Sequence, residues 1–234
     1  MISKFALITG ASRGIGRSIA VALAREGLHV IVTGRDEKAL EELKREIVTD
    51  RGSCTYIVAD LGKSAEIDNL VRLVTEISGS LDVLIHSAGI ARVGKVADLT
   101  PQDWYESLSV NLTAPFYLSR KCLPYLMRNA LIVFINSVAA KNSFPDWSAY
   151  SATKAGLAAF ADVLRSEVQE KGIKVTSVFS ASVDTPMQAS LPYKWDRSKM
   201  LTPEQVAQIV LYCYRQPRNV SVKNIDIENI AGTF

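Results

Sequence analysis

A tyrosine and a lysine four positions apart, Tyr150 and Lys154, occupy the segment SAYSATKAGL at residues 148–157. If this segment is helical, both side chains face the same side of the helix. A free tyrosine has a pKa of about 10, too high for efficient proton transfer at neutral pH, and a neighbouring ammonium lowers it. The pair therefore predicts a proton-transfer centre, with Tyr150 as general acid and base and Lys154 tuning it. The alternative is a chance pair that packs a helix edge.

The segments around this pair alternate between short apolar runs and stretches with helical periodicity. The apolar runs predict strands at residues 4–9, 29–33, 54–59, 81–87, 131–137, 173–180 and 220–230. Helices are expected at about 15–26, 36–48, 64–77, 102–128, from 150 onward, and 203–215. Continuous apolar strands that alternate with helices are typical of a parallel sheet covered on both faces. The chain is therefore predicted to be a single doubly wound α/β domain, residues 1–234, with seven strands.

Two further features are expected at the C-terminal edge of this sheet, where ligands of such folds bind. Ser137 ends the fifth predicted strand, and its hydroxyl could donate a hydrogen bond to a substrate oxygen as charge develops there. A lone serine in this position is otherwise a turn cap. Residues 181–202 are the longest irregular stretch and follow the sixth strand, so we expect a substrate-side loop rather than surface decoration.

A glycine-rich segment, LITGASRGIG at residues 7–16, joins the first strand to the first helix. Gly10, Gly14 and Gly16 permit a tight turn and a close approach of the backbone to a phosphate. The free N–H groups at the helix N-terminus would bind that phosphate. The spacing GxxxGxG is a weak signal alone, but its position after the first strand favours a dinucleotide site.

The end of the second strand indicates which nicotinamide cofactor the site prefers. An acidic residue there commonly holds the ribose 2′-hydroxyl, whereas an arginine accommodates a 2′-phosphate. This strand ends in Gly34 and Arg35, and Arg13 lies within the glycine turn. Two guanidinium groups suit a dianionic phosphate, so the sequence favours NADP(H) over NAD(H). The alternative is that both arginines are ordinary surface charges, one of them compensated by Asp36.

The composition excludes several other classes of function. The 234 residues carry a formal net charge of only +3, with basic residues interspersed among acidic ones, which argues against a nucleic-acid partner. The three cysteines are scattered and form no CxxC motif or Cys/His cluster, so neither a disulfide framework nor a metal site is expected. No run is typical of a signal peptide or a membrane span. We therefore expect a cytoplasmic protein without a membrane partner.

Seven short motifs occur in an order and spacing that are specific as a set. They are TGASRGIG (9–16), ADL (59–61), SAG (87–89), SVN (109–111), INS (135–137), YSATK (150–154) and VDT (183–185). With them the chain resembles the classical branch of the short-chain dehydrogenase/reductase family over nearly its whole length. The resemblance implies a Rossmann-type fold, a nicotinamide cofactor and reversible chemistry between carbonyls and alcohols.

The same resemblance assigns roles residue by residue. It implies a catalytic tetrad of Asn111, Ser137, Tyr150 and Lys154, in which Asn111 would anchor a water that leads protons toward Lys154. It implies that Lys154 also holds the nicotinamide ribose hydroxyls. The implied cofactor-binding residues are Gly10, Ser12, Arg13, Gly14, Ile15, Gly16, Arg35, Asp60, Leu61, Ala88, Gly89, Tyr150, Lys154, Val183 and Thr185. Within that set, the adenine would be flanked by Asp60 and Leu61, the adenosine ribose would lie over Ala88 and Gly89, and the carboxamide and phosphate side would contact Val183 and Thr185.

The chain departs from the family pattern at three places. His86 and Ser87 stand where the family has two asparagines, and we expect His86 to be a packed, hydrogen-bonded residue rather than a catalyst. Ser180 and Ala181 replace a Pro-Gly pair after the sixth strand, so the turn is less pre-set and a positive φ would be strained. The C-terminal segment resembles the sepiapterin-reductase-like and carbonyl-reductase-like branch.

These observations favour an NADP(H)-dependent carbonyl reductase or alcohol dehydrogenase that acts on a small-molecule ketone, aldehyde or alcohol. One alternative is a 3-oxoacyl-carrier-protein reductase, for which a basic docking patch would come from Arg120, Lys121 and Arg128. A second alternative is a non-catalytic NADP(H)-binding sensor, suggested by the altered HSAG motif. By resemblance we expect a homodimer or homotetramer formed through segments 102–128 and 150–171. The side chains expected to line the substrate pocket are Phe144, Pro145, Trp147, Met187, Leu191, Tyr193 and Trp195.

Overall fold

A computed structural model describes residues 4–194 and 196–232 of the chain. Within these residues, seven parallel strands form one sheet in the order β3-β2-β1-β4-β5-β6-β7. The strands are β1 (Phe5–Thr9), β2 (His29–Gly34), β3 (Ser53–Val58), β4 (Leu81–His86), β5 (Leu126–Ser137), β6 (Lys174–Ser180) and β7 (Asn224–Ile227). The strand order reverses between β1 and β4, and this is the point at which doubly wound sheets bind ligands. The predicted fold is confirmed: a single Rossmann-type domain.

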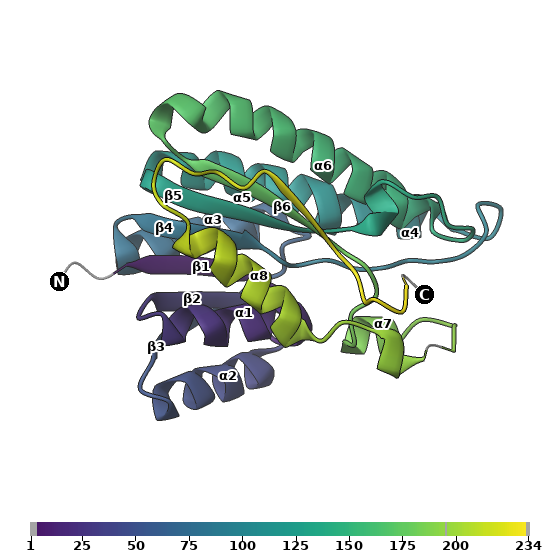
Figure 1. Cartoon of the computed structure of the whole chain (residues 1–234), viewed down its shortest axis with the longest axis horizontal. Coiled ribbons are helices and arrows are strands. Elements are labelled where there is room, and N and C mark those ends of the chain that lie inside the picture. Colours follow the sequence, from purple (N-terminus) through teal and green to yellow (C-terminus); the bar gives the residue numbers. More distant parts are fainter. Residues whose placement is uncertain (1–3, 195, 233–234) are drawn as a thin grey trace.

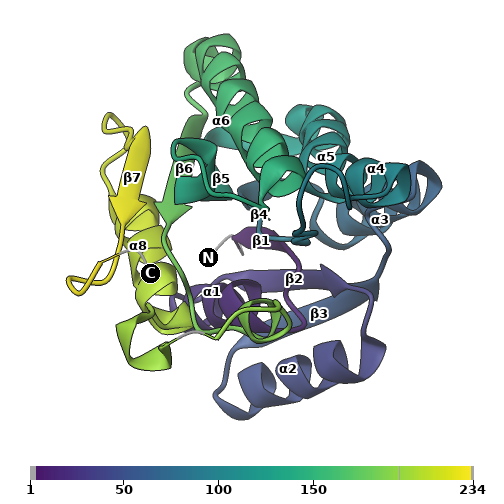
Figure 2. The same cartoon turned by 90° about the vertical axis from the view of Figure 1, so that its right-hand side faces the viewer.

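Helices cover both faces of the sheet (Figures 1 and 2). One face is covered by α1 (Gly14–Arg25), α2 (Glu37–Thr49) and α8 (Pro203–Arg215). The other face is covered by α3 (Ser64–Ser78), α5 (Ala114–Cys122) and α6 (Ser148–Val168), and α4 (Pro101–Leu108) packs against α6. A short helix, α7 (Pro186–Ala189), lies in the segment after β6, away from both layers.

The central strands are apolar throughout because both of their faces are buried. Along β1, Ala6 and Ile8 pack into the core beneath α1 and α8, whereas Leu7 packs into the core beneath α3 and α5. Side chains on the two faces of a strand therefore pack into two separate cores. This arrangement makes the sheet a rigid platform, and the loops at its C-terminal edge carry the candidate site.

The segment 102–128, predicted as one helix, is divided in the structure. It contains α4, a π-helical turn at Ser109–Thr113, α5 and a 3₁₀ turn at Leu123–Tyr125, and it enters β5 already at Leu126. Two prolines account for these breaks, because proline has no N–H to continue an α-helix. Pro115 removes the donor that would bond to the Asn111 carbonyl, and Pro124 lies in the 3₁₀ turn. Strand β7 is also shorter than the predicted 220–230.

Candidate active site

The turn from β1 into α1 is built from glycines that no other residue could replace without a collision. Gly10 has φ +64°, and a Cβ there would lie 2.7 Å from the Ala88 Cα. A Cβ on Gly16 would lie 2.5 Å from the carbonyl oxygen of Gly10. The turn therefore packs directly against the chain that follows β4 and against its own helix. It presents backbone rather than side chains to the space above it.

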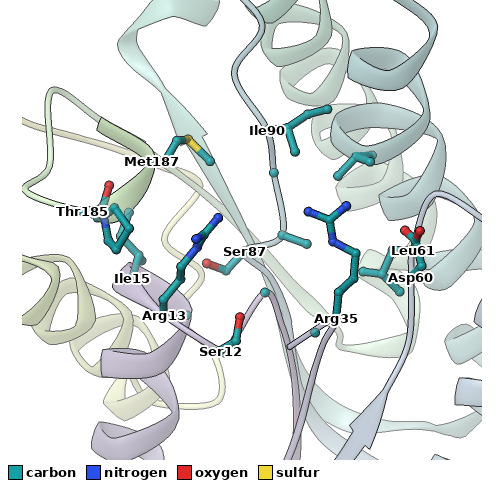
Figure 3. Close-up of a pocket in the computed structure, with 18 of the residues that line it drawn as sticks. Ser12, Arg13, Ile15, Arg35, Asp60, Leu61, Ser87, Ile90, Thr185 and Met187 are labelled. Atoms are coloured by element: carbon teal, nitrogen blue, oxygen red, sulfur yellow. The ribbon is translucent and has the colours of Figure 1, made fainter. Parts of the chain in front are cut away.

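A cavity of about 170 Å³ opens above this turn, at the C-terminal ends of β1, β2, β3 and β4 (Figure 3). Most of the predicted cofactor-binding residues line it, namely Gly10, Ser12, Arg13, Gly14, Ile15, Gly16, Arg35, Asp60, Leu61, Ala88, Gly89 and Thr185. Ser87, Ile90, Val110 and Met187 also line the cavity, and the sequence did not predict a cofactor role for them. Residues from the segments that follow β1, β2, β3, β4 and β6 thus converge on one space.

Two guanidinium groups flank this cavity (Figure 3). Arg13 and Arg35 are exposed, and neither forms an ion pair or hydrogen bond with any residue of 4–194 or 196–232. Asp36, which could have compensated Arg35, instead caps α2 by accepting a hydrogen bond from the Ala39 N–H at 3.1 Å. Both positive charges are therefore available to an anion in the cavity.

The turn after β4 is held by a threonine that sequence reasoning missed. The Thr9 hydroxyl accepts hydrogen bonds from the N–H groups of Ser87 and Ala88, at 3.0 and 3.1 Å, and donates to the Ile85 carbonyl at 3.1 Å. Thr9 thereby fixes the backbone beside the glycine turn, where the family's second asparagine is absent. Its position as the last residue of an apolar strand, immediately before Gly10, is the signal that could have identified it.

A second cavity, of about 80 Å³, adjoins the first and contains the tyrosine and serine of the predicted tetrad. Ser137 and Tyr150 both line it, as does Val183. The two cavities share Ile15, Thr185 and Met187 in their walls. A molecule bound in the first cavity would therefore reach the space in front of Tyr150.

Tyr150 and Lys154 lie on α6, which begins at Ser148, two residues earlier than predicted. The Lys154 Nζ donates a hydrogen bond to the Ile135 carbonyl at 2.9 Å and lies 5.6 Å from the centre of the Tyr150 ring. Burial raises the pKa of Tyr150 to about 12, although the Ser137 hydroxyl opposes this rise. Burial also lowers the pKa of Lys154 to about 8. The predicted lowering of the tyrosine pKa is wrong for this structure, because burial of the phenol dominates and the Lys154 ammonium is bonded to the Ile135 carbonyl.

Asn111 is fully buried within the π-helical turn and binds neighbouring chain segments. Its Oδ1 accepts from the Ile90 N–H at 2.9 Å, and its Nδ2 donates to the Ile90 carbonyl at 2.9 Å and to the Thr153 hydroxyl at 3.1 Å. Thr153 in turn donates to the Tyr150 carbonyl at 2.7 Å. Asn111 thus links the lining of the first cavity to the helix that carries Tyr150.

Ser137 is both a turn cap and a pocket residue. Its Oγ accepts a hydrogen bond from the Ala139 N–H at 3.1 Å, which leaves the hydroxyl hydrogen free to donate. The preceding residue, Asn136, accepts from the Ser137 N–H at 2.9 Å and donates to the Lys154 carbonyl at 3.2 Å. Asn136 therefore links the end of β5 to α6. This link fixes the position of the strand that carries Ser137 relative to the helix that carries Tyr150.

The departures from the family pattern have specific structural consequences. His86 is buried, stacks on Phe134 with ring centroids 4.7 Å apart, and shares a 2.9 Å hydrogen bond with the Ser119 hydroxyl. Burial lowers the pKa of His86 to about 3, so the predicted packed role is confirmed. Ala181 is not among the residues with positive φ, and its N–H donates to the Ile227 carbonyl at 2.9 Å. The expected strain after β6 is therefore absent, because Ala181 does not need a positive φ and its N–H is bonded to the last residue of β7.

Aromatic side chains form the outer wall of the second cavity. Trp147 packs edge-on against Tyr150, with centroids 5.3 Å apart and an interplanar angle of 74°, and stacks on Tyr193 at 6.3 Å. Of the predicted lining residues, Phe144, Trp147, Met187 and Leu191 line the cavity. Pro145 and Tyr193 are not among its lining residues, and Trp195 lies outside the described residues.

A family model described as short chain dehydrogenase matches residues 4–195. The chain belongs to this family. An uncharacterized oxidoreductase of Staphylococcus aureus strain MRSA252 is 31% identical over 98% of this chain and 99% of its own length. This chain is accordingly an oxidoreductase of the short-chain dehydrogenase/reductase type.

Solved structures of other short-chain dehydrogenases and reductases have the same architecture. An alcohol dehydrogenase from Thermococcus sibiricus, complexed with 5-hydroxy-NADP, is 26% identical with a TM-score of 0.92 over 98% of each chain. A variant of actinorhodin polyketide ketoreductase with NADPH is 28% identical with a TM-score of 0.90 over 99% of this chain and 98% of that one. The relationship thus spans the whole domain, including both cavities.

Other kinds of site are not found in the described part of the chain. Residues 4–194 and 196–232 contain no group of three or more His, Cys, Asp or Glu side chains that could hold a metal ion. Nor do they contain a helix with the length and apolar character that crossing a membrane requires. The cysteines Cys54, Cys122 and Cys213 are all buried as free thiols.

Proposed function

We propose that this short-chain dehydrogenase/reductase is an NADP(H)-dependent enzyme that interconverts a ketone or aldehyde with the corresponding alcohol. The observation that carries the proposal is the junction of the two cavities through Ile15, Thr185 and Met187. A dinucleotide in the first cavity would extend toward Tyr150 in the second. The alcohol dehydrogenase and the ketoreductase described above support this class of reaction.

The residues around the first cavity fit a nicotinamide dinucleotide. Side chains on Gly10 or Gly16 would collide with backbone, so both positions leave room for close approach of a pyrophosphate. The first N–H groups of α1 have no partner within the helix and no side-chain cap, and they could bind it. The exposed, unpaired guanidinium groups of Arg13 and Arg35 suit a 2′-phosphate and support NADP(H) over NAD(H). When bound, the cofactor supplies or accepts the hydride.

Tyr150 supplies the proton in the direction of reduction. Burial raises its pKa to about 12, so the side chain is protonated at neutral pH and can donate to the oxygen of a bound carbonyl. Ser137, whose hydroxyl lies within hydrogen-bonding reach of Tyr150, donates a second hydrogen bond to the same oxygen as it gains negative charge. The ammonium of Lys154, 5.6 Å from the centre of the Tyr150 ring, attracts the phenolate that remains after donation, but not strongly enough to offset the effect of burial on the tyrosine pKa.

The positions of Lys154 and Asn111 support their roles as the other two members of the proposed tetrad. The Lys154 Nζ lies 3.9 Å from the point that a Cβ on Gly89 would occupy, which brings it to the boundary of the first cavity. There it can bind the ribose hydroxyls that the family resemblance assigns to it. Pro115 cannot donate to the Asn111 carbonyl as an α-helical residue would, which favours a water at that carbonyl as the start of a proton path.

The arrangement of the basic residues gives little support to the alternative of a 3-oxoacyl-carrier-protein reductase. Arg128 lies near the start of β5, whereas Ser137 lies at its end. The regular part of β5 from Leu131 to Ser137 alone spans about 20 Å, at about 3.3 Å for each residue. Lys121 is engaged in an ion pair with Asp68 at 2.8 Å. A docked carrier would therefore have to use other residues to deliver an acyl chain to Tyr150.

Two further expectations remain proposals. Residues 181–202 are proposed as the substrate-side loop, because Met187, Gln188 and Leu191 line the cavity that contains Tyr150. A homo-oligomer formed through α4, α5 and α6 is in keeping with the exposed apolar side chains on these helices, among them Trp104, Tyr105, Phe116 and Val163. Size-exclusion chromatography with light scattering tests the oligomer.

The test of the proposed function is consumption of NADPH and of NADH with a panel of diketones, pteridines, aldehydes and acetoacetyl thioesters. We expect oxidation of NADPH with at least one neutral carbonyl compound, at a kcat/KM well above that with NADH. NADPH binding without turnover of any carbonyl compound would favour the sensor alternative. A clear preference for thioesters over free ketones would favour the carrier-protein alternative.

A further inference from the structure

The walls of the cavity in front of Tyr150 contain almost no charge. Of the described residues that line it, Tyr150 alone has an ionisable side chain, and the others are apolar, hydroxyl-bearing or, in one case, an amide. Two acidic groups nearby, Asp184 and Asp146, are engaged with other partners. Asp184 forms a bidentate pair with Arg197, with both hydrogen bonds at 2.8 Å, and Asp146 accepts from the Tyr193 hydroxyl at 3.3 Å.

This charge balance disfavours an ionised substrate. A carboxylate or ammonium that enters the cavity would lose its hydration without gaining an ion pair from the walls, and such burial is costly. The ammonium of Lys154 is directed to the Ile135 carbonyl at 2.9 Å and is not part of the cavity lining. The apolar side chains of Phe144, Trp147 and Leu191 favour a hydrocarbon or aromatic body instead.

The single amide in the wall has an unused hydrogen-bond donor. Gln188 belongs to α7, and its N–H donates to the Thr185 hydroxyl at 3.3 Å, which fixes the start of this short helix. Its side-chain Nε2 is buried and has no hydrogen-bond partner within the described part of the chain. Buried polar groups in native proteins are nearly always paired, so an unpaired donor in a pocket wall calls for a partner. Nε2 itself is shielded from solvent, so a neutral oxygen of a bound ligand would supply this partner once the Gln188 side chain turns toward the cavity.

We propose that the substrate is an uncharged ketone with an apolar body and a second, neutral acceptor oxygen that binds the Gln188 amide. Keto esters, keto amides and diketones are members of this class. The proposal rests on the proposed function, because it describes the occupant of the same site. Gln188 thereby becomes a specificity-determining residue, whereas Tyr150 and Ser137 act on the reacting carbonyl.

The charge requirement is tested with two ketones that share one carbon skeleton, the neutral ester methyl levulinate and the anion levulinate, which differ in charge and by one methyl group. With NADPH as the reductant, we expect kcat/KM for the ester to exceed that for the anion at least about 100-fold. Equal values for the two compounds would overturn the proposal while leaving the proposed function in place. Failure of every ketone would count against the proposed function itself.

The role of Gln188 is tested with ethyl acetoacetate and 2-heptanone, which have chains of the same length with and without the ester oxygens. In Gln188→Met, which keeps the length of the side chain and removes the donor, the ratio of kcat/KM for the ester to that for heptanone should fall about tenfold. The ratio controls for the greater intrinsic reactivity of the keto ester. Gln102→Met, on the exposed face of α4, should leave the ratio unchanged. An unchanged ratio in Gln188→Met would overturn the assignment.

A binding measurement tests the same contact without turnover. Protein loaded with NADP⁺ cannot reduce a ketone, so the melting temperature in the presence of ethyl acetoacetate reports binding alone. We expect the ester to raise the melting temperature of the wild type and of Gln102→Met, and to raise that of Gln188→Met clearly less. Equal protection of all three proteins would contradict the proposed contact, whatever the kinetic results.

Discussion

The ammonium of Lys154 donates its hydrogen bond to the Ile135 carbonyl at 2.9 Å, while the Tyr150 ring centre lies 5.6 Å away. The two side chains therefore share one end of α6 without a direct bond between them. Burial acts on both and disfavours the charged form of each, so the tyrosine pKa rises and the lysine pKa falls. A buried lysine that keeps its proton at pH 7 costs folding free energy, and this cost has a measurable pH dependence.

The first prediction concerns stability in Lys154→Met. The folded pKa of Lys154, about 8, lies below the unfolded value of 10.5, so the unfolded chain binds more protons between these values. Its destabilising effect is fully present below pH 8 and is relieved as the pH rises toward 10.5. Between pH 7.5 and pH 10, the wild type should therefore gain about 2 kcal/mol relative to the variant. Urea unfolding at both pH values measures this, and parallel stability curves for the two proteins would contradict it.

The second prediction concerns cofactor choice. Arg35→Ala removes one of two unpaired guanidinium groups at the first cavity, so the Kd for NADPH should rise at least about tenfold while that for NADH changes little. Arg13→Ala should act in the same direction. The control is Arg45→Ala on α2, whose guanidinium pairs with Glu41 at 3.5 Å outside the cavity. Titration by fluorescence gives the constants, and equal losses for both nucleotides would refute the phosphate role.

The third prediction separates backbone strain from steric collision at the glycine turn. Gly10 and Gly79 have nearly the same φ, +64° and +66°, but a Cβ on Gly79 meets nothing within 4 Å. Gly79→Ala should therefore lose only about 1 kcal/mol of stability. Gly10→Ala should lose about 1–3 kcal/mol more, because its Cβ would lie 2.7 Å from the Ala88 Cα, and it should lose NADPH binding. Similar stabilities for the two variants would show that the turn is not tightly packed.

The fourth prediction concerns the aromatic wall. Tyr193 stacks on Trp147, and Trp147 packs edge-on against Tyr150. Tyr193→Leu removes the stacked ring, so the KM for a ketone should rise about three- to tenfold, because the aromatic contact contributes about 0.5–1.5 kcal/mol. The Kd for NADPH should not change. Tyr212→Leu, at an exposed position on α8, is the matched control. A rise in the NADPH Kd of Tyr193→Leu would mean that the loop acts on the cofactor cavity instead.

The order of strands and helices could be predicted from the sequence because the strands are buried on both faces. Leu7 and Ile8 point into different cores, so β1 is apolar without alternation. The continuous apolar run of the strand gives way to a helical spacing of apolar residues where α1 begins. The glycine turn was equally predictable, since Gly10 and Gly16 leave no room for a side chain. These features depend on local sequence, and the structure agrees with them.

Contacts between distant segments could not be predicted in the same way. The Ile135 carbonyl that binds Lys154, and the Thr9 hydroxyl that binds the turn after β4, are brought into place by the packing of separate elements. The pKa of Tyr150 was misjudged for this reason, because neither its burial nor the partner of Lys154 follows from the spacing of two residues. The freedom from strain at Ala181 likewise depends on a hydrogen bond to Ile227, in a strand more than forty residues away.

The central claim, that Tyr150 is the proton donor, is tested most directly in Tyr150→Phe. This change removes the hydroxyl alone and keeps the ring that packs against Trp147. With a ketone that the wild type reduces, kcat for NADPH oxidation at pH 7 should fall at least about 100-fold, while the Kd for NADPH stays within about threefold. Wild-type kcat in Tyr150→Phe, measured beside intact NADPH binding, would contradict the account.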